Sequence, residues 1–199
     1  MPQPTDGPRA RYREQVRTEV HDHAWAQIAE AGASGLSLKA IAQQMGMTAP
    51  ALYRYFASRD DLLTELVLAA YRDLAETVEA AAARTGDPTR QVRAVSGALR
   101  VWAVQAPQRY LLIYGTPVPG YTAPPEATEL AQRIFAPLQS ALAARLTGAR
   151  RERRSFDLTV RLWTRLHGVL SLEAAGHFDT MDVEPATLFA HELASVLES

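Results

Sequence analysis

The amino-acid sequence predicts an all-α protein. Apolar residues recur every three or four positions in successive stretches of the 199-residue chain, which is the spacing that gives a helix one buried face. Proline, glycine, serine and aspartate stand between these stretches, at the places where helices begin and end. The hydrophobic content of 47% is enough for a substantial core, and the absence of cysteine excludes disulfides, thiolate catalysis and cysteine-ligated zinc.

The N-terminal part is expected to contain one long helix over residues 9–31, after a disordered tail over residues 1–8. Four apolar residues at a spacing of four form one stripe, which must pack on the helices that follow: Val16, Val20, Ala24 and Ile28. His21 and His23 are two positions apart and point to nearly opposite sides of a helix, so they cannot share a metal. We interpret both histidines as surface residues.

Residues 35–62 contain two short helical patterns joined by a tight turn, the layout of a helix-turn-helix. Ser37 is expected to cap a helix over 38–45, and Gly46 to end it in the left-handed conformation. Thr48 is then the cap of a second helix, which begins at Ala49 and is expected to run to Phe56. A third helix follows at once over 59–84, with Ser58 as its cap and Asp61 completing a capping box. Its predicted inner face comprises Leu62, Leu63, Leu66, Val67, Ala70, Leu74 and Val78.

The second short helix leaves small residues at its tip and then tyrosine and arginine side chains facing outward. Small residues allow a helix N-terminus to enter a major groove, while tyrosine hydroxyls and arginine suit phosphate oxygens. The outward residues are Thr48, Ala49, Pro50, Tyr53, Arg54 and Tyr55. The formal net charge is only −1, but basic residues concentrate near this motif. Beside a helix-turn-helix, phosphate contact is favoured over a solvated tail for the preceding arginines, Arg9, Arg11, Arg13 and Arg17.

The stretch GLSLKAIAQQMGMTAPALYRYFASRDDLL resembles the DNA-binding segment of the TetR family of bacterial transcriptional regulators. The resemblance includes Ala51-Leu52-Tyr53, the aromatic pair Tyr55-Phe56, and a basic residue followed by acids and leucines from Arg59. Arg59 departs from the family's usual lysine but keeps the charge. The resemblance implies a homodimer in which Tyr53, Tyr55 and Arg59 hold phosphates. It also implies that the bases are faced by Thr48, Ala49, Pro50 and Arg54; we add Ser37 and Lys39 to the DNA-binding set.

The rest of the chain is expected to form a helical domain. Helices are predicted over 89–106, 126–146, 155–176 and from 185 onward, with a short apolar segment at 108–114 and a stiff, proline-rich loop at 115–125. Residues 148–154, GARRERR, are interpreted as a solvated basic connector rather than a DNA-binding patch. The helix over 155–176 carries two apolar stripes, one for the domain interior and one for a second subunit. Pairing with the last helix would build the four-helix dimer interface that the family resemblance implies.

The segment Trp163-Thr164-Arg165-Leu166-His167-Gly168 and the YGTPVPGY loop are similar to a Trp-His-Gly subgroup of TetR C-terminal domains. His167 stands on an apolar stripe, where a satisfied core histidine and a ligand contact are equally open. Aromatic residues at helical spacing are usually core, but large apolar walls with a few polar groups also make a pocket. The candidate ligand-binding residues are Trp102, Tyr110, Tyr114, Phe135, Trp163 and His167.

Other chemistry has little support in the sequence. Glu173, His177, Asp179 and Asp182 are metal-ligating residue types, yet loop solvation explains them as well, so no metal and no cofactor are expected. Phosphate-binding glycine motifs are absent, and Ser171 near His167 has no acid to complete a triad, so we do not expect an enzyme. No stretch resembles a membrane span or signal peptide, and we expect a cytoplasmic protein.

Taken together, the sequence predicts a disordered tail over 1–8, a helix-turn-helix DNA-binding domain over 9–57 and a helical ligand-binding and dimerisation domain over 58–199. The expected function is that of a transcriptional repressor. It forms a homodimer through its last two helices and binds a palindromic double-stranded DNA operator. A small hydrophobic or aromatic effector releases it from the operator. The alternatives are a helical small-molecule-binding protein or enzyme whose helix-turn-helix does not read DNA, and a regulator without an effector.

Overall fold

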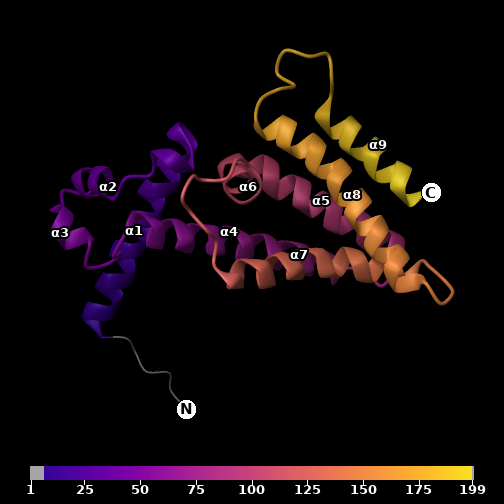
Figure 1. The fold of residues 1–199 in the computed structure, drawn as a ribbon, viewed down its shortest axis with the longest axis horizontal. Helices are drawn as coiled ribbons and strands as arrows, with labels where there is room; N and C mark the ends of the chain where they lie inside the picture. Colours follow the sequence, from indigo (N-terminus) through magenta and orange to yellow (C-terminus); the bar gives the residue numbers. More distant parts are fainter. Residues whose placement is uncertain (1–6, 199) are drawn as a thin grey trace. The chain divides into compact units, whose positions relative to one another are not determined.

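The computed structural model describes residues 7–198, and within that range every regular element is helical, which confirms the predicted all-α class. One short 3-10 turn lies at Ala33–Gly35, between the first two α-helices (Figure 1). The prediction of a disordered tail falls, for residues 1–6, outside the described residues, whereas Pro8 already belongs to the first helix. The α-helices are α1 (Pro8–Ala31), α2 (Leu38–Gln44), α3 (Ala49–Leu52), α4 (Arg59–Ala82), α5 (Pro88–Gln105), α6 (Pro107–Tyr114), α7 (Pro125–Ala144), α8 (Arg151–Ala174) and α9 (Pro185–Leu197).

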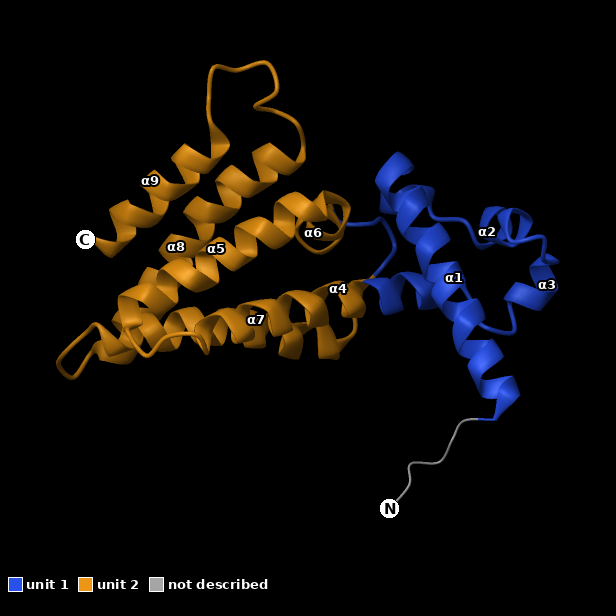
Figure 2. Cartoon of the chain, turned by 180° about the vertical axis from the view of Figure 1, so that it is seen from behind, with its two compact units in different colours: residues 1–66, 117–121 blue, residues 67–116, 122–199 orange. Residues whose placement is uncertain are grey.

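The chain forms two compact units, which Figure 2 shows in different colours. The first contains residues 7–66 together with 117–121, and the second contains residues 67–116 and those from 122 onward. The division falls inside α4, after Leu66, so this one helix supplies residues to both units. The segment 117–121 belongs to the first unit, where the Tyr121 hydroxyl lies 3.2 Å from Oγ1 of Thr64.

The core of the first unit is the one that the apolar spacing predicts. The stripe of α1 is buried along its whole length, and α2 buries Leu38, Ile41 and Ala42 against it. Leu52 and Phe56 are 0% and 1% exposed, and they complete the core beneath the turn between α2 and α3. The Oγ of Ser58 accepts the Asp61 N–H at 3.0 Å, as expected of a cap at the start of α4. The unit is therefore a three-helix support that holds α3 at its surface.

Helix α3 is shorter than the sequence suggested. The expected helix runs to Phe56, but α3 ends at Leu52 and the chain continues as a turn. The Tyr55 N–H bonds to the Leu52 carbonyl three residues back, at 2.8 Å, which winds the chain more tightly than an α-helix. This tight winding returns Phe56 to the core, while Tyr53 and Arg54 remain exposed on the turn.

The second unit buries an apolar face on each of α5, α7 and α9. Asp87 caps α5 by accepting the Arg90 N–H at 2.7 Å, and α7 buries Leu130, Ile134 and Leu138 along one side. Helix α7 also carries Pro137 in its interior and continues past it to Ala144. Further buried residues come from α5, α8 and α9: Val92, Val95, Leu99, Leu162, Leu166, Phe189, Leu193 and Val196.

The interpretation of residues 148–154 as a connector is wrong for its second half. Helix α8 begins at Arg151, so three arginines that were expected in a loop lie in its first turns. Gly148 has a φ of 90° and begins the turn that leads into α8, where its carbonyl accepts the Arg151 N–H at 3.2 Å, and no helix-breaking residue separates it from Ser155. Ser155 lies within the helix, where its hydroxyl donates to the Glu152 carbonyl at 2.7 Å. The consequence is a strongly basic helix N-terminus.

Candidate functional sites

The turn between α2 and α3 is built by two caps and one glycine. The Oγ of Ser37 accepts the Ala40 N–H at 3.3 Å, and its own N–H donates to Oε1 of Gln27 on α1 at 2.9 Å. Gly46 adopts a φ of 65°, a conformation that costs other residues free energy, and lets the chain reverse toward α3. The Oγ1 of Thr48 accepts the Ala51 N–H at 3.4 Å. The start of α2 is thus bonded to α1, and α3 begins at a cap of its own after the left-handed glycine.

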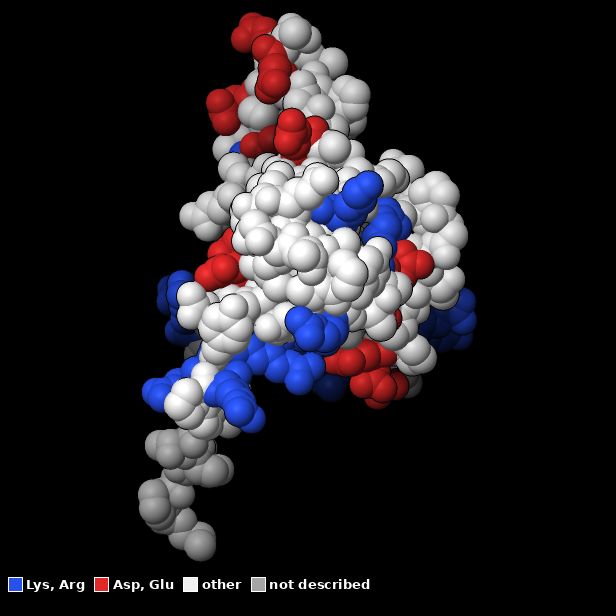
Figure 3. Space-filling view, turned by 90° about the vertical axis from the view of Figure 1, so that its left-hand side faces the viewer, with Lys and Arg blue, Asp and Glu red and all other residues white. Residues whose placement is uncertain are grey.

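The outer side of this turn carries the predicted DNA-binding residues. Lys39, Thr48, Pro50 and Arg54 are exposed, and Tyr53 is 48% exposed, whereas Ala49 and Tyr55 are half-buried. Neither Lys39 nor Arg54 has a side-chain bond to another described residue. Figure 3 shows basic side chains bordering an uncharged area on this face. The surface therefore combines free cationic groups, a tyrosine hydroxyl and a helix end with little side-chain bulk.

Arg59 has a structural task that the sequence did not reveal. Its Nε donates to the Leu36 carbonyl at 3.1 Å, and its Nη2 donates to the Ala33 carbonyl at 2.8 Å. These bonds join the start of α4 to the segment that leads into α2. Its Nη1 also lies 3.1 Å from Oδ1 of Asp60. The guanidinium thus occupies most of its donors inside the unit, and its predicted phosphate contact remains a prediction.

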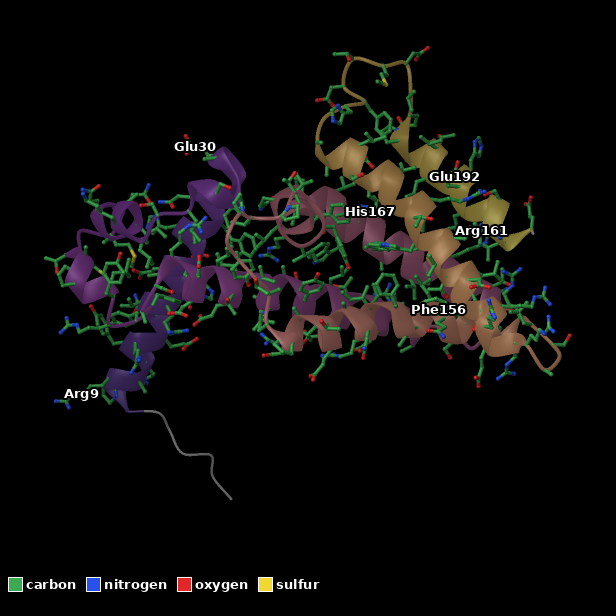
Figure 4. The ribbon with its side chains drawn as sticks, viewed as in Figure 1. Arg9, Glu30, Phe156, Arg161, His167 and Glu192 are labelled. Carbon is green, nitrogen blue, oxygen red and sulfur yellow. The ribbon has the colours of Figure 1, made fainter. Side chains whose placement is uncertain are left out.

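Arg17 differs from the other arginines of α1. Its Nη1 donates to the Tyr55 carbonyl at 3.1 Å, its Nη2 is bonded to Oε1 of Glu65, and its guanidinium lies 4.6 Å from the centre of the Phe56 ring. This corrects the expectation that Arg17 belongs to a phosphate-binding group, because its donors are directed into the unit. The remaining arginines of the group are exposed on the first half of α1, where Figure 4 labels Arg9: Arg9, Arg11 and Arg13.

His21 also departs from its interpretation as a surface residue. Its Nε2 lies 3.2 Å from Oε2 of Glu65, and its ring centre lies 5.9 Å from that of Phe56. Glu65 therefore bridges Arg17 and His21, one turn apart on α1. The missed signal is the spacing of Arg17 and His21 by four residues, which places both on the side that faces α4.

Five of the six predicted ligand-binding residues come together in the second unit. The aromatic cluster consists of Tyr110 and Tyr114 from α6, Phe135 from α7, and Trp163 and His167 from α8. The Trp163 ring stacks on His167 at 5.3 Å and 16°, Phe135 meets Trp163 edge-on at 4.9 Å, and Tyr114 lies 4.8 Å from Trp163. Such contacts are worth about 0.5–1.5 kcal/mol each beyond burial. Tyr71 of α4, which sequence reasoning missed, adds a further edge contact to Tyr114 at 6.1 Å.

Polar atoms inside the aromatic cluster are few and strongly desolvated. The Tyr110 hydroxyl lies 2.6 Å from Nδ1 of His167, and Tyr110 is fully buried. Burial lowers the pKa of His167 and raises the pKa of Tyr110, so both groups are neutral at pH 7. The buried phenol finds no other partner among the described residues, so its proton is best placed toward Nδ1. His167 then presents Nε2–H as a hydrogen-bond donor.

Tyr114 holds the unsatisfied polar atom of the aromatic cluster. Its hydroxyl oxygen is buried and has no hydrogen-bond partner within residues 7–198. Burial is the main cause that raises the pKa of Tyr114, and the neighbouring Tyr71 and Tyr110 add to it. A buried hydroxyl without a partner costs about 1–3 kcal/mol, and a ligand that supplies one recovers this free energy. The cluster therefore holds one buried hydroxyl whose hydrogen-bonding capacity is unused within the described residues.

Trp102 lies elsewhere in the unit. Its Nε1–H donates to Oδ2 of Asp73 at 2.8 Å, and Arg109 donates to the same oxygen at 2.8 Å. Its indole nitrogen is directed toward α4. Trp102 also borders a groove of about 830 Å³, which is lined by α4, α5 and α6. The sequence placed Trp102 with the other five residues because it shares their helical spacing, but spacing does not say which neighbour a face meets.

Two further observations bear on the alternatives. Within residues 7–198 there is no group of three or more histidine, aspartate or glutamate side chains arranged to hold a metal ion. Among the helices of this same range, none combines the length and the apolar character that crossing a membrane requires.

Comparison with protein families decides the relationship of the chain. A family model described as "Tetracyclin repressor-like, C-terminal domain" matches residues 92–196, more than half of the sequence. The chain belongs to the TetR family of transcriptional regulators. A second model, described as "Bacterial regulatory proteins, tetR family", matches residues 21–66 of this TetR-family protein and includes the helix-turn-helix. The narrower resemblance to a Trp-His-Gly subgroup remains a prediction.

Individual relatives agree with this membership. Over 141 residues the TetR-family chain is 45% identical to the HTH-type transcriptional regulators Rv1816 of Mycobacterium tuberculosis and Mb1846 of Mycobacterium bovis. The aligned region covers 69% of this chain and 60% of the length of those relatives. The crystal structure of SCO4313 is 48% identical, with a TM-score of 0.86 over 97% of this chain and 100% of that one. AibR, solved with isovaleryl coenzyme A and operator DNA, shares the fold at 13% identity and a TM-score of 0.65.

Proposed function

We propose that this TetR-family chain is a repressor that binds a palindromic DNA operator as a homodimer and is released by a small apolar or aromatic effector. The observation that carries the DNA-binding part is the contrast between two sets of cationic groups. Arg17 and Arg59 bond to backbone carbonyls inside the first unit, whereas Lys39 and Arg54 remain exposed beside α3. Unpaired cationic side chains around the N-terminus of a helix can bind DNA phosphates, and small side chains at that N-terminus allow it to enter a major groove.

The homodimer is supported by an unpartnered face on α8. Phe156, Val160 and Leu172 are 56%, 43% and 44% exposed, although they are large and apolar. Each step of four residues turns about 40° around the helix, so Phe156 and Val160 are neighbours near the start of α8, while Leu172 lies near its end and further round the exposed side. A two-fold dimer through α8 and α9 covers this side and predicts an operator whose half-sites lie one or more helical turns apart.

The effector is supported by the buried Tyr114 hydroxyl and the Nε2–H of His167. An effector with one hydrogen-bond acceptor satisfies either group, and apolar walls favour an uncharged molecule. Effector binding shifts the population between DNA-competent and DNA-incompetent states. The coupling free energy equals the difference in effector affinity between the two states.

DNA binding is tested with duplex DNA from immediately upstream of the chain's own gene, across a salt series and against a scrambled duplex. The wild-type chain is expected to prefer the upstream duplex by about a thousandfold. Arg54→Ala and Tyr53→Phe should weaken specific binding by tenfold or more without changing thermal stability, because both side chains are exposed. Arg93→Ala, an exposed arginine of α5, is the matched control and should bind normally. Unchanged binding by both variants of the first unit would remove the support for this reading.

Effector binding is tested by thermal shift and by DNA release with acetophenone, chalcone and 1-naphthol, three neutral aromatic probes with one oxygen each. Tyr114→Phe should lose at least tenfold in affinity for any probe that binds the wild-type chain. Trp102→Phe, outside the aromatic cluster, is the control and should retain that affinity. Equal loss in both variants, or binding that leaves DNA affinity unchanged, would contradict an effector role for the aromatic cluster.

A further inference from the structure

Helix α8 has a cluster of basic residues at its N-terminal end, and the loop that follows its C-terminal end is acidic. The basic end consists of Arg150, Arg151, Arg153 and Arg154, all exposed. The acidic loop spans 179–184 and contains Asp179, Asp182 and Glu184, also exposed. Figure 1 shows that the two lie at opposite ends of α8. Within one chain they are therefore too far apart to neutralise each other.

The basic end keeps a net positive charge, because its four arginines outnumber Glu152 in the first turn and Asp157 in the second. Arginines in the first turn of a helix oppose its dipole, which already places positive partial charge there. None of the four guanidinium groups has a hydrogen bond or ion pair with a side chain in the described range. Arg150, Arg153 and Arg154, with Asp157, border an open hollow of about 640 Å³. An acidic group from outside the chain would relieve both the mutual repulsion and the dipole.

The acidic loop is equally without a counterpart. The carboxylates of Asp179 and Asp182 have no bonded cation among residues 7–198, and Glu184 only caps α9 by accepting the Ala186 N–H at 3.2 Å. The loop also exposes two apolar side chains, Met181 at 56% and Val183 at 39%. Acidic charge mixed with exposed apolar surface indicates an interaction surface rather than a loop that only faces water.

The side of α8 between these ends has the form of a helix-packing face. A row of residues at a spacing of four winds across it, turning by about 40° at each step, and its larger apolar members are exposed. Gly168 leaves open space where a side chain would stand, so a second helix can approach closely. Figure 4 shows Phe156 near the start of α8. The stripe consists of Phe156, Val160, Thr164, Gly168 and Leu172.

We propose that two copies of this chain pack α8 on α8 in antiparallel register, with the basic end of each copy bound to the acidic loop of the other. A two-fold axis midway between Thr164 and Gly168 brings together residues equally far before and after that point. The basic end of each copy then lies beside the acidic loop of the other, because that loop follows the end of α8 at Ala174. The arrangement is isologous, so each dimer contains the contact twice. This inference rests on the proposed homodimer and adds its register and its charge pairing.

The test uses two charge-reversed full-length variants, whose folding is checked by circular dichroism. One is Arg153→Glu with Arg154→Glu, and the other is Asp179→Arg with Asp182→Arg. Each variant alone places like charges together, so its dimer dissociation constant in 50 mM NaCl, from analytical ultracentrifugation, should rise at least tenfold. A mixture of the two restores both opposite-charge contacts, so native mass spectrometry should show the heterodimer in large excess over either homodimer. Raising NaCl to 500 mM should weaken the wild-type dimer and strengthen both variant homodimers.

The other outcomes separate this inference from the proposed homodimer. Val160→Glu, within the exposed stripe, should dissociate the dimer in low and high salt alike. If it does so while both charge-reversed variants dimerise like the wild type without heterodimer preference, the charge pairing is wrong and the homodimer stands. A wild-type chain that stays monomeric at all concentrations overturns both. An arginine variant that loses DNA affinity but dimerises normally shows that the basic end binds DNA, which also overturns the pairing.

Discussion

Replacing Arg17 by Met separates two roles that arginines play on the same helix. The substitution keeps the aliphatic stem but removes the hydrogen bond to the Tyr55 carbonyl, the ion pair with Glu65 and the contact with the Phe56 ring. A hydrogen bond from a charged group is worth about 1.5–3 kcal/mol. The half-exposed ion pair adds about 0.2–1 kcal/mol, and the ring contact about 0.5–1 kcal/mol. Because the three share one guanidinium, we expect a loss of about 2–4 kcal/mol rather than a full sum.

The assay is hydrogen–deuterium exchange of the amides in α1 and α2, which reports the free energy of opening of the first unit. A loss of 2–4 kcal/mol corresponds to exchange that is faster by about 30-fold to several hundredfold. Arg13→Met is the matched control, because Arg13 is exposed on the same helix and has no partner among the described residues. It should leave exchange nearly unchanged and lower the slope of DNA affinity against salt by about 1.

The opposite pattern would refute this reasoning. If Arg17→Met leaves the exchange rates unchanged and reduces the salt slope as Arg13→Met does, the Arg17 guanidinium binds phosphate and the bonds inside the first unit contribute nothing measurable.

Three more predictions concern two buried polar groups of the aromatic cluster and the internally bonded Arg59. Tyr114→Phe removes the unsatisfied hydroxyl and should raise the stability of the ligand-free chain by up to about 1–3 kcal/mol in urea unfolding, whereas a loss would show that the hydroxyl has a partner. Burial lowers the pKa of His167 from its ordinary value of 6.5, so below about pH 6.5 the unfolded state binds more protons than the folded state. The free energy of unfolding therefore falls as the pH drops below about 6.5. His167→Asn keeps an acceptor near the Nδ1 position and should flatten that fall between pH 6.5 and 5. Arg59→Lys should cost about 1–2 kcal/mol in thermal unfolding, because an ammonium cannot reach the Ala33 and Leu36 carbonyls in the same way; an unchanged Tm would contradict this.

Helical spacing and capping residues were sufficient to locate the helices. Ser37, Thr48 and Ser58 were expected to cap and do so, because a cap is a bond between residues two or three positions apart. The end of α3 and the start of α8 were misplaced. For α3 the missing information was the core position of Phe56, which local propensity does not contain. For α8 the missed signal was local, because no helix-breaking residue stands between Gly148 and Ser155.

The helical class, the exposed residues beside α3 and the apolar stripes follow from the sequence by itself, since each depends on the order of residues along one helix. The roles of individual polar groups depend on which helices meet. Arg17 and Arg13 have the same chemistry and lie on one helix, yet only Arg17 faces the Tyr55 carbonyl and Glu65. Trp102 and Trp163 each stand among apolar residues at helical spacing, yet only Trp163 stacks on His167. Tertiary structure decides such roles because a polar group bonds to whatever partner packing brings within about 3 Å, and that partner lies far away in the sequence.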